Sequence, residues 1–579
     1  MPERDRNEPY SDLAFYQSLG LKSGLEVHRQ LDTERKLFCN CPAVRTYSDH
    51  YDAELLRHMR PTLSELGEYD PTALMEFKTK KEIVYRLGRD TVCTYEMDDA
   101  PPFGLNRDAL ERALLVGMML NLSLVDEIHI SRKQYLDGSI PTGFQRTCIV
   151  GINGYLVCRG RRIGVRQLGL EEDACREVAD RGHVRTYMTD RLSIPLIEVV
   201  TEPDMRTPAE VGWVASVIQR LCHLSGVVRT GLGKVRQDVN VSISGGARVE
   251  IKGVPRIRQI PALVHFEALR QRALLEVRDL CRSRGLSPDA FREEMDVSDM
   301  ARRYPHPLFA AIGRGGRARA IVLRNSTGVL AYPTGPRRTF GHELADRVRV
   351  IACIDTVPNM VHSDDPDAFA LAGLFDAVRR QVGAGAGDTV VITAGPERDC
   401  LTAMSEVRLR MVEALQGVPR ETRKALPGGA TCFERLLPGP DRMYPDTDLP
   451  PVVLSREMLD RVRGRVPQPL WEKEAAYAQA GLSAQQIERL MTTDMFGLFD
   501  EALPRVRLRP AILAYLLLDW LLALRRAGVD TRAVDADLLA RLFGGEEAAT
   551  MRQRDAAAAL AMVLGHVPGW AAGGGNDAS

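Results

Sequence analysis

The pattern of hydrophobic residues changes along this chain, and the change excludes one uniform architecture. The residues before Arg282 mix short strand-like runs with helices, whereas the chain from Ser455 onward has leucine and alanine at helical spacing and no strand signal. From about Arg282 another segment mixes strands with helices. A chain of 579 residues is also too long for one hydrophobic core, so we expect three or four domains.

Hydrophobic spacing before Arg282 predicts both kinds of element. Short apolar runs predict strands at residues 128–131, 147–152, 155–160 and 194–200, and apolar residues at i, i+3 and i+4 predict helices at 107–120 and 208–224. The second helix begins Thr207-Pro208-Ala209-Glu210, which puts threonine at the N-cap, proline at the first helical position and glutamate at the capping-box position.

The segment after Arg282 has a pattern of its own. It predicts strands at residues 318–325, 349–355 and 389–395 and helices at 366–382 and 400–415. Its length of roughly 140 residues is typical of a self-contained domain. The run GAGAG at 383–387 could cradle a phosphate, but it follows a helix and precedes a strand, which favours a flexible connector.

Composition narrows the class of protein. Basic and acidic residues number 77 each, so net charge does not indicate nucleic-acid binding and any RNA contact needs a local basic face. Eleven loosely spaced cysteines do not resemble a disulfide framework and favour a reducing compartment. No stretch approaches the roughly 20 apolar residues of a membrane span. We therefore expect a cytoplasmic protein with no membrane association, and a frayed tail at residues 571–579.

Two stretches place polar side chains on one face of a predicted strand. In GLEVHRQL, Glu26 and His28 are two residues apart, and alternate residues of a strand share a face. KVRQDVNVSISGGARVEIKG alternates strictly around a Gly-Gly turn. Its shared faces carry Arg236, Asp238 and Asn240 before the turn, and Glu250 and Lys252 after it. Such faces either line a ligand cradle or face solvent, and for the second stretch the residues alone favour a face exposed to solvent.

Acidic residues gather beside two further apolar runs. Glu171, Glu172 and Asp173 are adjacent, so they repel one another and favour a bound cation. The start of a helix would also accommodate them. Glu198 lies inside an apolar run, where an unpaired carboxylate is costly and a metal ion or a fixed cationic partner would relieve that cost.

Basic residues bracket the loop RKQYLDGSIPTGFQRT. Arg132, Lys133 and Arg146 flank glycine, serine and threonine residues, and this combination suits a phosphate group. An ordinary hairpin loop is the alternative.

Other well-known motifs are absent. The chain has no GxxxxGK[ST], so any use of ATP is not of the P-loop type, and it has no GxSxG or HExxH. Cys39 and Cys41 form a C-x-C pair, but no second C-x-x-C pair follows at zinc spacing, so zinc is the less favoured interpretation.

Six motifs, taken in order, resemble one family. They are GLEVHxQL, KLFCNC, DGSxxxGFQRT, LEEDA, DRLxIPLIEVxTEPD and GLGxxRQDVNVSI…RVEIKG. The chain resembles the GatB/GatE family of amidotransferases, which make Gln-tRNA from Glu-tRNA, and within that family it resembles the archaeal-type E form. GFQRT and RQDVNVSI carry the likeness to the E form. The segment from about Arg282 to Leu415 resembles the insertion domain of bacterial-type aspartyl-tRNA synthetases.

The resemblance implies an α+β fold class with several domains. These are a mixed-sheet cradle catalytic domain, an inserted aspartyl-tRNA-synthetase-like α+β domain, and C-terminal all-α helical and tail domains. We assign residues 1–281 to the first part of the cradle, 282–418 to the insertion, 419–454 to the segment that returns to the cradle, and 455–579 to the helical domain with a shortened tail.

The resemblance also implies a two-step reaction with ATP and Mg²⁺ as cofactors. ATP phosphorylates the side-chain carboxylate of the glutamate on Glu-tRNA(Gln), and ammonia then displaces phosphate to give Gln-tRNA(Gln). The implied catalytic residues are Glu26, His28, Glu171 and Glu198, and the implied metal ligands are His28, Glu171, Glu172 and Glu198. The implied contacts to nucleotide or phosphate are Arg132, Lys133, Arg146, Arg236, Asp238, Asn240 and Lys252. Because imidazole suits softer ions than Mg²⁺, His28 is expected to bond a metal-bound water or a phosphate, or to act as a base.

No amide-hydrolysing nucleophile is evident in the sequence. The family therefore implies that ammonia comes from a separate protein, the asparaginase-like partner GatD, in a heteromer arranged as a dimer of heterodimers. Two alternatives stay open: an ATP-dependent amidotransferase for another carboxylate, and a non-catalytic tRNA-binding protein of the same fold.

Overall fold

The computed structural model describes residues 10–63, 67–231, 233–437, 439, 442–493 and 495–566. Its contacts divide the chain into two compact units. The first comprises Met1–Ala215 and Val235–Leu459, and the second comprises Ser216–Lys234 and Asp460–Ser579. The expected class, α+β with mixed sheets and a helical C-terminal part, is confirmed.

An eleven-stranded sheet organises the first unit. Its strand order is β21-β20-β13-β12-β1-β11-β8-β7-β6-β22, with β4 paired to β7. The strands are β1 Lys22–Gln30, β4 Ser123–Leu124, β6 Ile130–Gln134, β7 Phe144–Cys158, β8 Arg161–Glu172, β11 Pro195–Thr201, β12 Val235–Ser242, β13 Val249–Val254, β20 Glu421–Ala425, β21 Thr431–Leu436 and β22 Met443–Pro445. Residues 419–454 therefore contribute strands to both edges of this sheet.

The alternation of side chains divides this sheet into an apolar and a polar face. On β1, Leu25 and Val27 are buried, as are Val239 and Val241 of β12. Helix α5 (Ile260–Ser283) packs against β12, and α3 (Arg107–Met119) packs against β7 and β8. Because neighbouring strand residues point to opposite faces, the polar residues between these apolar ones point to the other side of the sheet.

Helix α4 (Pro208–Leu224) begins as the sequence predicts. The Thr207 hydroxyl accepts a hydrogen bond from the Glu210 backbone N–H at 3.2 Å. The Glu210 carboxylate bonds the backbone N–H of Arg206, one residue earlier than in a standard capping box, at 2.7 Å.

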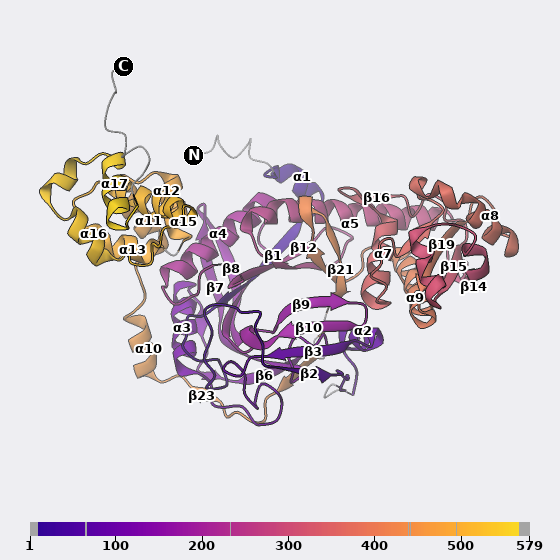
Figure 1. Ribbon diagram of the computed structural model, residues 1–579, viewed down its shortest axis with the longest axis horizontal. Helices are drawn as coiled ribbons and strands as arrows, with labels where there is room; N and C mark the ends of the chain where they lie inside the picture. The colour runs from indigo at the N-terminus through magenta and orange to yellow at the C-terminus, as the bar shows by residue number, and fades with distance from the viewer. Residues whose placement is uncertain are drawn as a thin grey trace, which may run out of the picture. The chain divides into compact units, whose positions relative to one another are not determined.

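A second sheet of four strands lies in the same unit, in the order β2-β3-β10-β9. Its strands are β2 Ala53–Arg57, β3 Glu82–Leu87, β9 Arg176–Arg181 and β10 Val184–Met188, and β3, β9 and β10 are neighbouring arrows in Figure 1. Ile83, Tyr85 and Tyr187 form part of its buried core. Helix α2 (Pro71–Thr79) leads into β3.

The segment after Arg282 holds a third sheet, in the order β14-β15-β19-β18. Its strands are β14 Glu293–Asp296, β15 Arg317–Leu323, β18 Met360–His362 and β19 Thr389–Gly395. Helices α7 (Phe340–Ile351), α8 (Ala372–Gln381) and α9 (Glu397–Ala414) flank β14, β15 and β19 in Figure 1. The glycine-rich run 383–387 joins α8 to β19 as a turn and loop.

One predicted strand of this segment is wrong. Residues 349–351 are the last residues of helix α7, and residues 352–359 form turns and loops. The apolar side chains of the run RVIACID bury themselves from a helix end and a loop, with Ile351 and Ile354 both in the core. A short apolar run cannot distinguish a strand from a buried helix end by periodicity alone.

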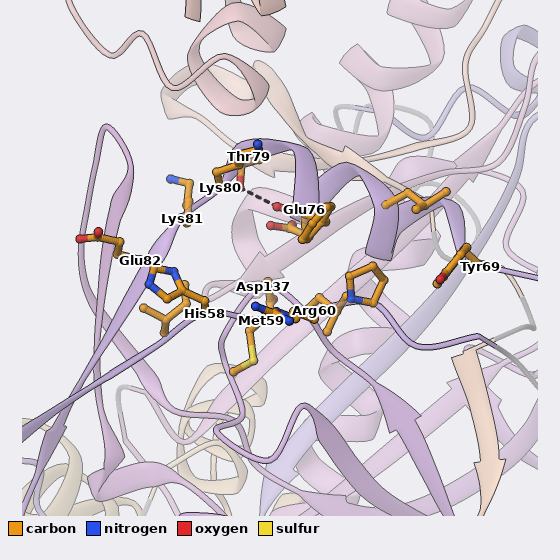
Figure 2. Close-up of a pocket in the computed structure, with 15 residues that line it drawn as sticks. His58, Met59, Arg60, Tyr69, Glu76, Thr79, Lys80, Lys81, Glu82 and Asp137 are labelled. Carbon is orange, nitrogen blue, oxygen red and sulfur yellow. Dashed lines mark hydrogen bonds between the residues drawn. The ribbon is translucent and has the colours of Figure 1, made fainter. Parts of the chain in front are cut away.

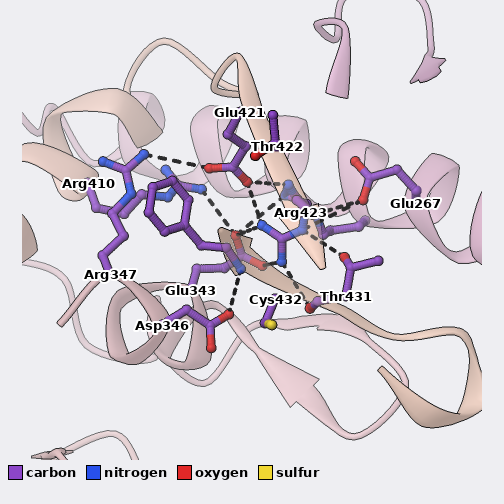
Figure 3. Close-up of polar contacts among 12 residues, drawn as sticks. Glu267, Glu343, Asp346, Arg347, Arg410, Glu421, Thr422, Arg423, Thr431 and Cys432 are labelled. Atoms are coloured by element: carbon purple, nitrogen blue, oxygen red, sulfur yellow. Dashed lines mark hydrogen bonds and ion pairs between the residues drawn. The ribbon is translucent and has the colours of Figure 1, made fainter. Parts of the chain in front are cut away.

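A buried ion network joins this segment to the large sheet. Figure 3 shows carboxylates of Glu267, Glu343 and Glu421 around the Arg423 guanidinium. Arg423 on β20 lies 2.9 Å from Glu343 on α7, and Arg270 on α5 lies 2.6 Å from Glu421 on β20. The side chains of all these residues are at most 5% exposed, so the charges are shielded from water.

From residue 456 onward, the regular elements of the described residues are all helices, as predicted. The helices are α10 Arg456–Arg463, α11 Leu470–Gln479, α12 Ala484–Met491, α13 Met495–Ala502, α14 Pro510–Tyr515, α15 Leu521–Arg526, α16 Ala536–Phe543 and α17 Gln553–Val563. A π-helical turn, Leu516–Trp520, joins α14 to α15. No helix of the described part of the chain is long and apolar enough to cross a membrane. The predicted frayed tail, 571–579, lies outside the described residues.

Candidate active site

Three predicted site residues meet on the polar face of the large sheet. His28 Nε2 on β1 lies 3.3 Å from a carboxylate oxygen of Glu198 on β11 and 3.8 Å from one of Glu171 on β8. Strand pairing explains the meeting, because His28 is directly opposite Glu198 and Glu198 is directly opposite Gly169 of β8, two residues before Glu171. One ligand atom from each of the three residues lies within 4.8 Å of the others.

Lys133 on β6 supplies the positive charge of this group. Its ammonium lies 2.8 Å from Glu171 and 3.8 Å from Glu198. Burial would raise the pKa of Glu198, but Lys133 and the hydrogen bond with His28 outweigh it and hold that pKa well below its usual range. Burial and Arg236 would lower the pKa of His28, but its bond to Glu198 and nearby carboxylates raise it. The carboxylate of Glu198 is therefore ionised.

Gly169 leaves space beside this carboxylate. A Cβ at position 169 would lie 3.5 Å from Glu198 Oε2. The strand opposite Glu198 therefore contributes no side chain at this point.

A second group of acids adjoins the first on the same face. Ligand atoms of Glu26, Asp238 and Glu250 lie within 4.8 Å of one another, and Lys252 lies 2.9 Å from Asp238 and 2.6 Å from Glu250. Burial, together with the charges of Glu250 and Glu198, raises the pKa of Glu26 to about 7. Glu26 can therefore gain or lose a proton near neutral pH.

Two other predicted residues lie on the strand next to β1. Asn240 donates a hydrogen bond to Glu26 at 3.1 Å, and Arg236 bonds Asp173 at 2.9 Å. Arg236 is also directly opposite His28 across the β1–β12 pair. The strict alternation predicted for this stretch is thus confirmed, and it brings Arg236, Asp238 and Asn240 to the face that carries His28.

Three predicted residues lie on the opposite face of the sheet. Glu172 accepts hydrogen bonds from Tyr95 at 2.7 Å and from Ser193 at 2.8 Å. Arg146 lies 2.7 Å from Asp446, and Arg132 pairs with Arg146 across the strands. The structure does not bring Glu172, Arg132 or Arg146 to the His28 group. Glu172 and Arg132 are the strand neighbours of Glu171 and Lys133, which face the group, so they point to the other side of the sheet. Arg146 is paired with Arg132 and points the same way.

The local structure separates the alternatives for the acidic run. Glu171 and Glu172 are the last two residues of β8, and no helix begins among residues 171–188. The acids therefore do not cap a helix. Asp173, just beyond the strand, is fully buried and paired with Arg236 and Arg191.

The His28 group fits a divalent cation that prefers oxygen ligands. Glu171 and Glu198 offer carboxylate oxygens, which Mg²⁺ binds in proteins. Two buried polar atoms on this face, His28 Nδ1 and Asn240 Oδ1, have no hydrogen-bond partner among the described residues. Polar atoms that are buried without a partner point to a ligand or to water at this place.

A separate pocket of about 720 Å³ lies elsewhere in the first unit. Figure 2 shows its lining, which includes His58, Arg60, Glu76 and Lys81 and comes mainly from α2, β3 and the chain before α2. It contains none of the predicted catalytic or metal-binding residues, so its size alone does not locate the chemistry.

Two residues of this region lie outside the set of candidate site residues that the sequence predicts. Glu250 belongs to the second acidic group, and the sequence marks it only by the strand face that it shares with Lys252 after the Gly-Gly turn. Tyr95 bonds both Glu172 and Arg146, at 2.7 and 3.2 Å. No local pattern marks Tyr95, because its partners are more than 50 residues away in sequence.

Comparison with known proteins agrees with this arrangement. A family model described as the GatB/GatE catalytic domain matches residues 21–460. The glutamyl-tRNA(Gln) amidotransferase GatE of Methanopyrus kandleri is 39% identical over 529 residues, which cover 90% of this chain and 82% of that protein. The protein of the same name from Aeropyrum pernix is 37% identical over 572 residues, 96% of this chain and 87% of that protein. The one from Methanocaldococcus jannaschii is 36% identical over 520 residues, 89% and 82% respectively.

The matched range contains the large sheet and both acidic groups. The chain belongs to the GatB/GatE family, whose members carry an amidotransferase catalytic domain. Within that family it is of the archaeal GatE type, and it is an enzyme of the ligase class. The likeness of residues 282–418 to an aspartyl-tRNA synthetase insertion stays a prediction.

Proposed function

We propose that this chain activates the side-chain carboxylate of the glutamate on Glu-tRNA(Gln) with ATP and then converts it to the amide of Gln-tRNA(Gln). The meeting of His28, Glu171, Glu198 and Lys133 on one sheet face carries the proposal. The names of the relatives from M. kandleri and A. pernix supply the substrate.

The first step requires two anions to approach one another. An oxygen of the glutamate carboxylate attacks the γ-phosphorus of ATP, and ADP leaves, which gives an acyl phosphate. When bound, Mg²⁺ supplies positive charge that lets the carboxylate and the phosphate approach. Glu171 and Glu198 would hold that ion through their carboxylate oxygens, and His28 would bond a water or the phosphate beside it.

Fixed cations on the same face take up the remaining negative charge. Lys133 and Arg236 line the His28 group, and Lys252 lies in the adjoining acidic group. Their side chains are half-buried and held by neighbouring carboxylates, so they need little reorganisation when a phosphate arrives. These residues are suited to orient the nucleotide phosphates.

The second step replaces the phosphate with ammonia. The nitrogen attacks the acyl carbon, the phosphate leaves, and the nitrogen loses one proton. Glu26, whose pKa of about 7 lies near the working pH, is suited to accept that proton. The ammonia comes from the asparaginase-like partner GatD in a heteromeric complex, arranged as a dimer of heterodimers.

Substitution of Glu198 tests this proposal most directly. We expect Glu198→Gln to lower ATP-dependent formation of Gln-tRNA by at least about 100-fold. The substitution removes a charged ligand of the ion, and the ion stabilises the negative charge of the transition state. The assay supplies Glu-tRNA(Gln), ATP, Mg²⁺ and free ammonium, so that it does not depend on a partner. Thermal melting checks that the variant is folded.

Glu202→Gln is the matched control. Glu202 follows the same strand, pairs with Arg166 and is partly exposed, so its loss should leave the rate unchanged. Full activity of folded Glu198→Gln contradicts the ion site. ATP hydrolysis that does not depend on tRNA favours another carboxylate substrate, and the absence of both ATP hydrolysis and amide formation favours a non-catalytic tRNA-binding protein.

A further inference from the structure

We propose that Asp173 is a positioning residue, which holds the Arg236 guanidinium toward the transferred phosphate beside His28. This role rests on the proposed function, because the phosphate comes from ATP in that reaction. Asp173 lies just beyond the end of β8, and its side chain is fully buried. One of its carboxylate oxygens lies 2.9 Å from Nη1 of Arg236 on β12.

The carboxylate of Asp173 has a fixed direction. Its Oδ1 accepts hydrogen bonds from Arg236 and, at 2.9 Å, from the backbone N–H of Ala174. Its Oδ2 accepts a hydrogen bond from the buried side chain of Gln30 at 2.7 Å and lies 3.6 Å from Nε of Arg191. Rotation of the carboxylate would leave buried donors without a partner, which is costly. The oxygen that meets Arg236 is therefore held in place.

Arg236 has donors left for a ligand. Among the described residues, Asp173 is the only hydrogen-bond partner of its side chain, and the bond uses Nη1. The Arg236 side chain is 28% exposed, and its strand position is directly opposite His28. A guanidinium binds a phosphate through a pair of parallel N–H groups. Nε and Nη2 of Arg236 can supply such a pair while Nη1 stays with Asp173.

The second arginine beside Asp173 has a different task. Arg191 donates to the backbone carbonyls of Ala174 and Cys175 at 2.9 and 2.8 Å, so its donors hold the loop that follows β8. No such bond from Arg236 to a backbone carbonyl occurs in the described part of the chain. Asp173 thus connects an arginine that fixes a loop to an arginine that faces the active site.

A fixed guanidinium is valuable in phosphoryl transfer. Negative charge spreads over the phosphate oxygens in the transition state, and a donor that is already in place stabilises this charge without reorganisation. Without the Asp173 carboxylate, Arg236 keeps its charge but loses its direction. A displacement of about 1 Å can lower a rate about 100-fold. The loss should therefore appear in kcat more than in the KM for ATP.

Steady-state kinetics of Asp173→Asn in the full-length chain test this role, with Glu-tRNA(Gln), ATP, Mg²⁺ and free ammonium as substrates. We expect kcat to fall at least about tenfold and the KM for ATP to change less than about threefold. Arg236→Gln should lower kcat at least as much. Addition of Asp173→Asn to Arg236→Gln should cause no further loss, because one residue acts through the other. An unchanged kcat in Asp173→Asn, or a further loss of about tenfold in the double variant, would overturn the role.

Arg191→Met is the matched control, because it removes the other cation beside Asp173. We expect it to lower the melting temperature, as Asp173→Asn does, but to leave kcat within about threefold of the unmodified chain. A loss of kcat equal to that of Asp173→Asn would reduce Asp173 to a structural residue. If Asp173→Asn does not fold, Gln30→Met decides, since it frees Oδ2 and keeps both charges. It should lower kcat at least about threefold at an unchanged KM, and a normal kcat would contradict the role.

Binding of ADP with aluminium fluoride, Mg²⁺ and Glu-tRNA(Gln) separates this role from the proposed function. The fluoride complex imitates the transferred phosphate, so the unmodified chain should bind the combination at least about tenfold more tightly than ADP without fluoride. Asp173→Asn should lose most of that gain. Absence of the gain in the unmodified chain contradicts phosphoryl transfer, and the proposed function fails with it. A gain that Asp173→Asn retains overturns the role of Asp173 alone.

Discussion

Lys133 lies between two carboxylates that repel each other unless a positive charge is near both. Its ammonium contacts Glu171 at 2.8 Å and Glu198 at 3.8 Å, and the two acids raise its pKa although burial alone would lower it. A divalent ion bound by the same acids brings more positive charge than the lysine does. At the residue scale, Lys133 and the ion therefore compete for the same oxygens and jointly attract a phosphate.

This competition predicts an unusual response to Lys133→Gln. We expect the rate of Gln-tRNA formation to fall about 100-fold or more, because a cation near the transferred phosphate is lost. The Mg²⁺ concentration that gives half-maximal activity should not rise, because the acids lose a competing partner. A Mg²⁺ titration of activity measures both quantities. Lys22→Gln, at the exposed start of β1, is the control and should change neither. An increased Mg²⁺ requirement in Lys133→Gln argues against competition.

The raised pKa of Glu26 predicts that the stability of the metal-free chain depends on pH. Its folded pKa of about 7 lies above the ordinary value of 4.5, so between these pH values the folded state holds a proton that the unfolded state has lost. Stability at this residue is therefore greatest below pH 4.5 and decreases as pH rises to about 7. The side chain of Glu26→Gln carries no such proton. The melting temperature of this variant, minus that of the unmodified chain, should therefore increase as pH rises from 4.5 to about 7. Parallel melting curves across the interval contradict the assignment.

At the scale of elements, buried ion pairs connect helices α5 and α7 to strand β20. Arg423 contacts Glu343 and Glu421 with almost no access to water. Taking such groups out of water is costly, so the pairing offsets a penalty rather than adding a large net gain. Removing one partner is a different matter, because it leaves the other charges buried and unpaired.

Arg423→Met should therefore destabilise the chain by about 3–5 kcal/mol. Urea unfolding followed by circular dichroism measures this change. Arg292→Met serves as the control, because Arg292 is 68% exposed in its pair with Asp289 and its loss should change stability by no more than about 0.5 kcal/mol. A loss below about 1 kcal/mol for Arg423→Met means that water or the neighbouring Arg270 compensates the acids.

At the scale of the whole molecule, the two compact units do not follow the chain in order. Residues 216–234 belong with the helices after Leu459, although they lie inside the sequence of the first unit. Helix α4 crosses this boundary, and its Arg220 forms an ion pair with Glu474 of α11. A chain that ends at Leu459 therefore keeps helix α4 but lacks residues of the second unit that α4 contacts, such as Glu474.

A chain truncated after Leu459 should expose apolar side chains of α4. Ile218, Leu221 and Cys222 are buried in the complete chain. We expect the truncated chain to bind a hydrophobic dye and to melt at a lower temperature than the complete chain. Glu474→Gln in the complete chain separates the ion pair from the packing, and should cost no more than about 1 kcal/mol. A truncated chain with normal melting and no dye binding contradicts this division.

Much of the architecture follows from local patterns in the sequence. Alternation predicted the shared face of Glu26 and His28 and the β12–β13 hairpin, because the two-residue period of a strand is a property of neighbouring residues. A short apolar run predicted strand β19, which is buried throughout. Helical spacing predicted α3, α4 and the helical C-terminal part in the same way. The motifs also sufficed to indicate the family that the comparisons show.

Tertiary structure decided which of these residues meet. The sequence presents Glu171 and Glu172 as equals, yet strand pairing turns Glu171 toward His28 and Glu172 toward Tyr95. Cys93 joins the C-x-C pair only because the fold places its loop there. Periodicity fixes the direction of a side chain relative to its neighbours in the chain, but strand order and register fix its partners, and these depend on the free energy of the whole packed core.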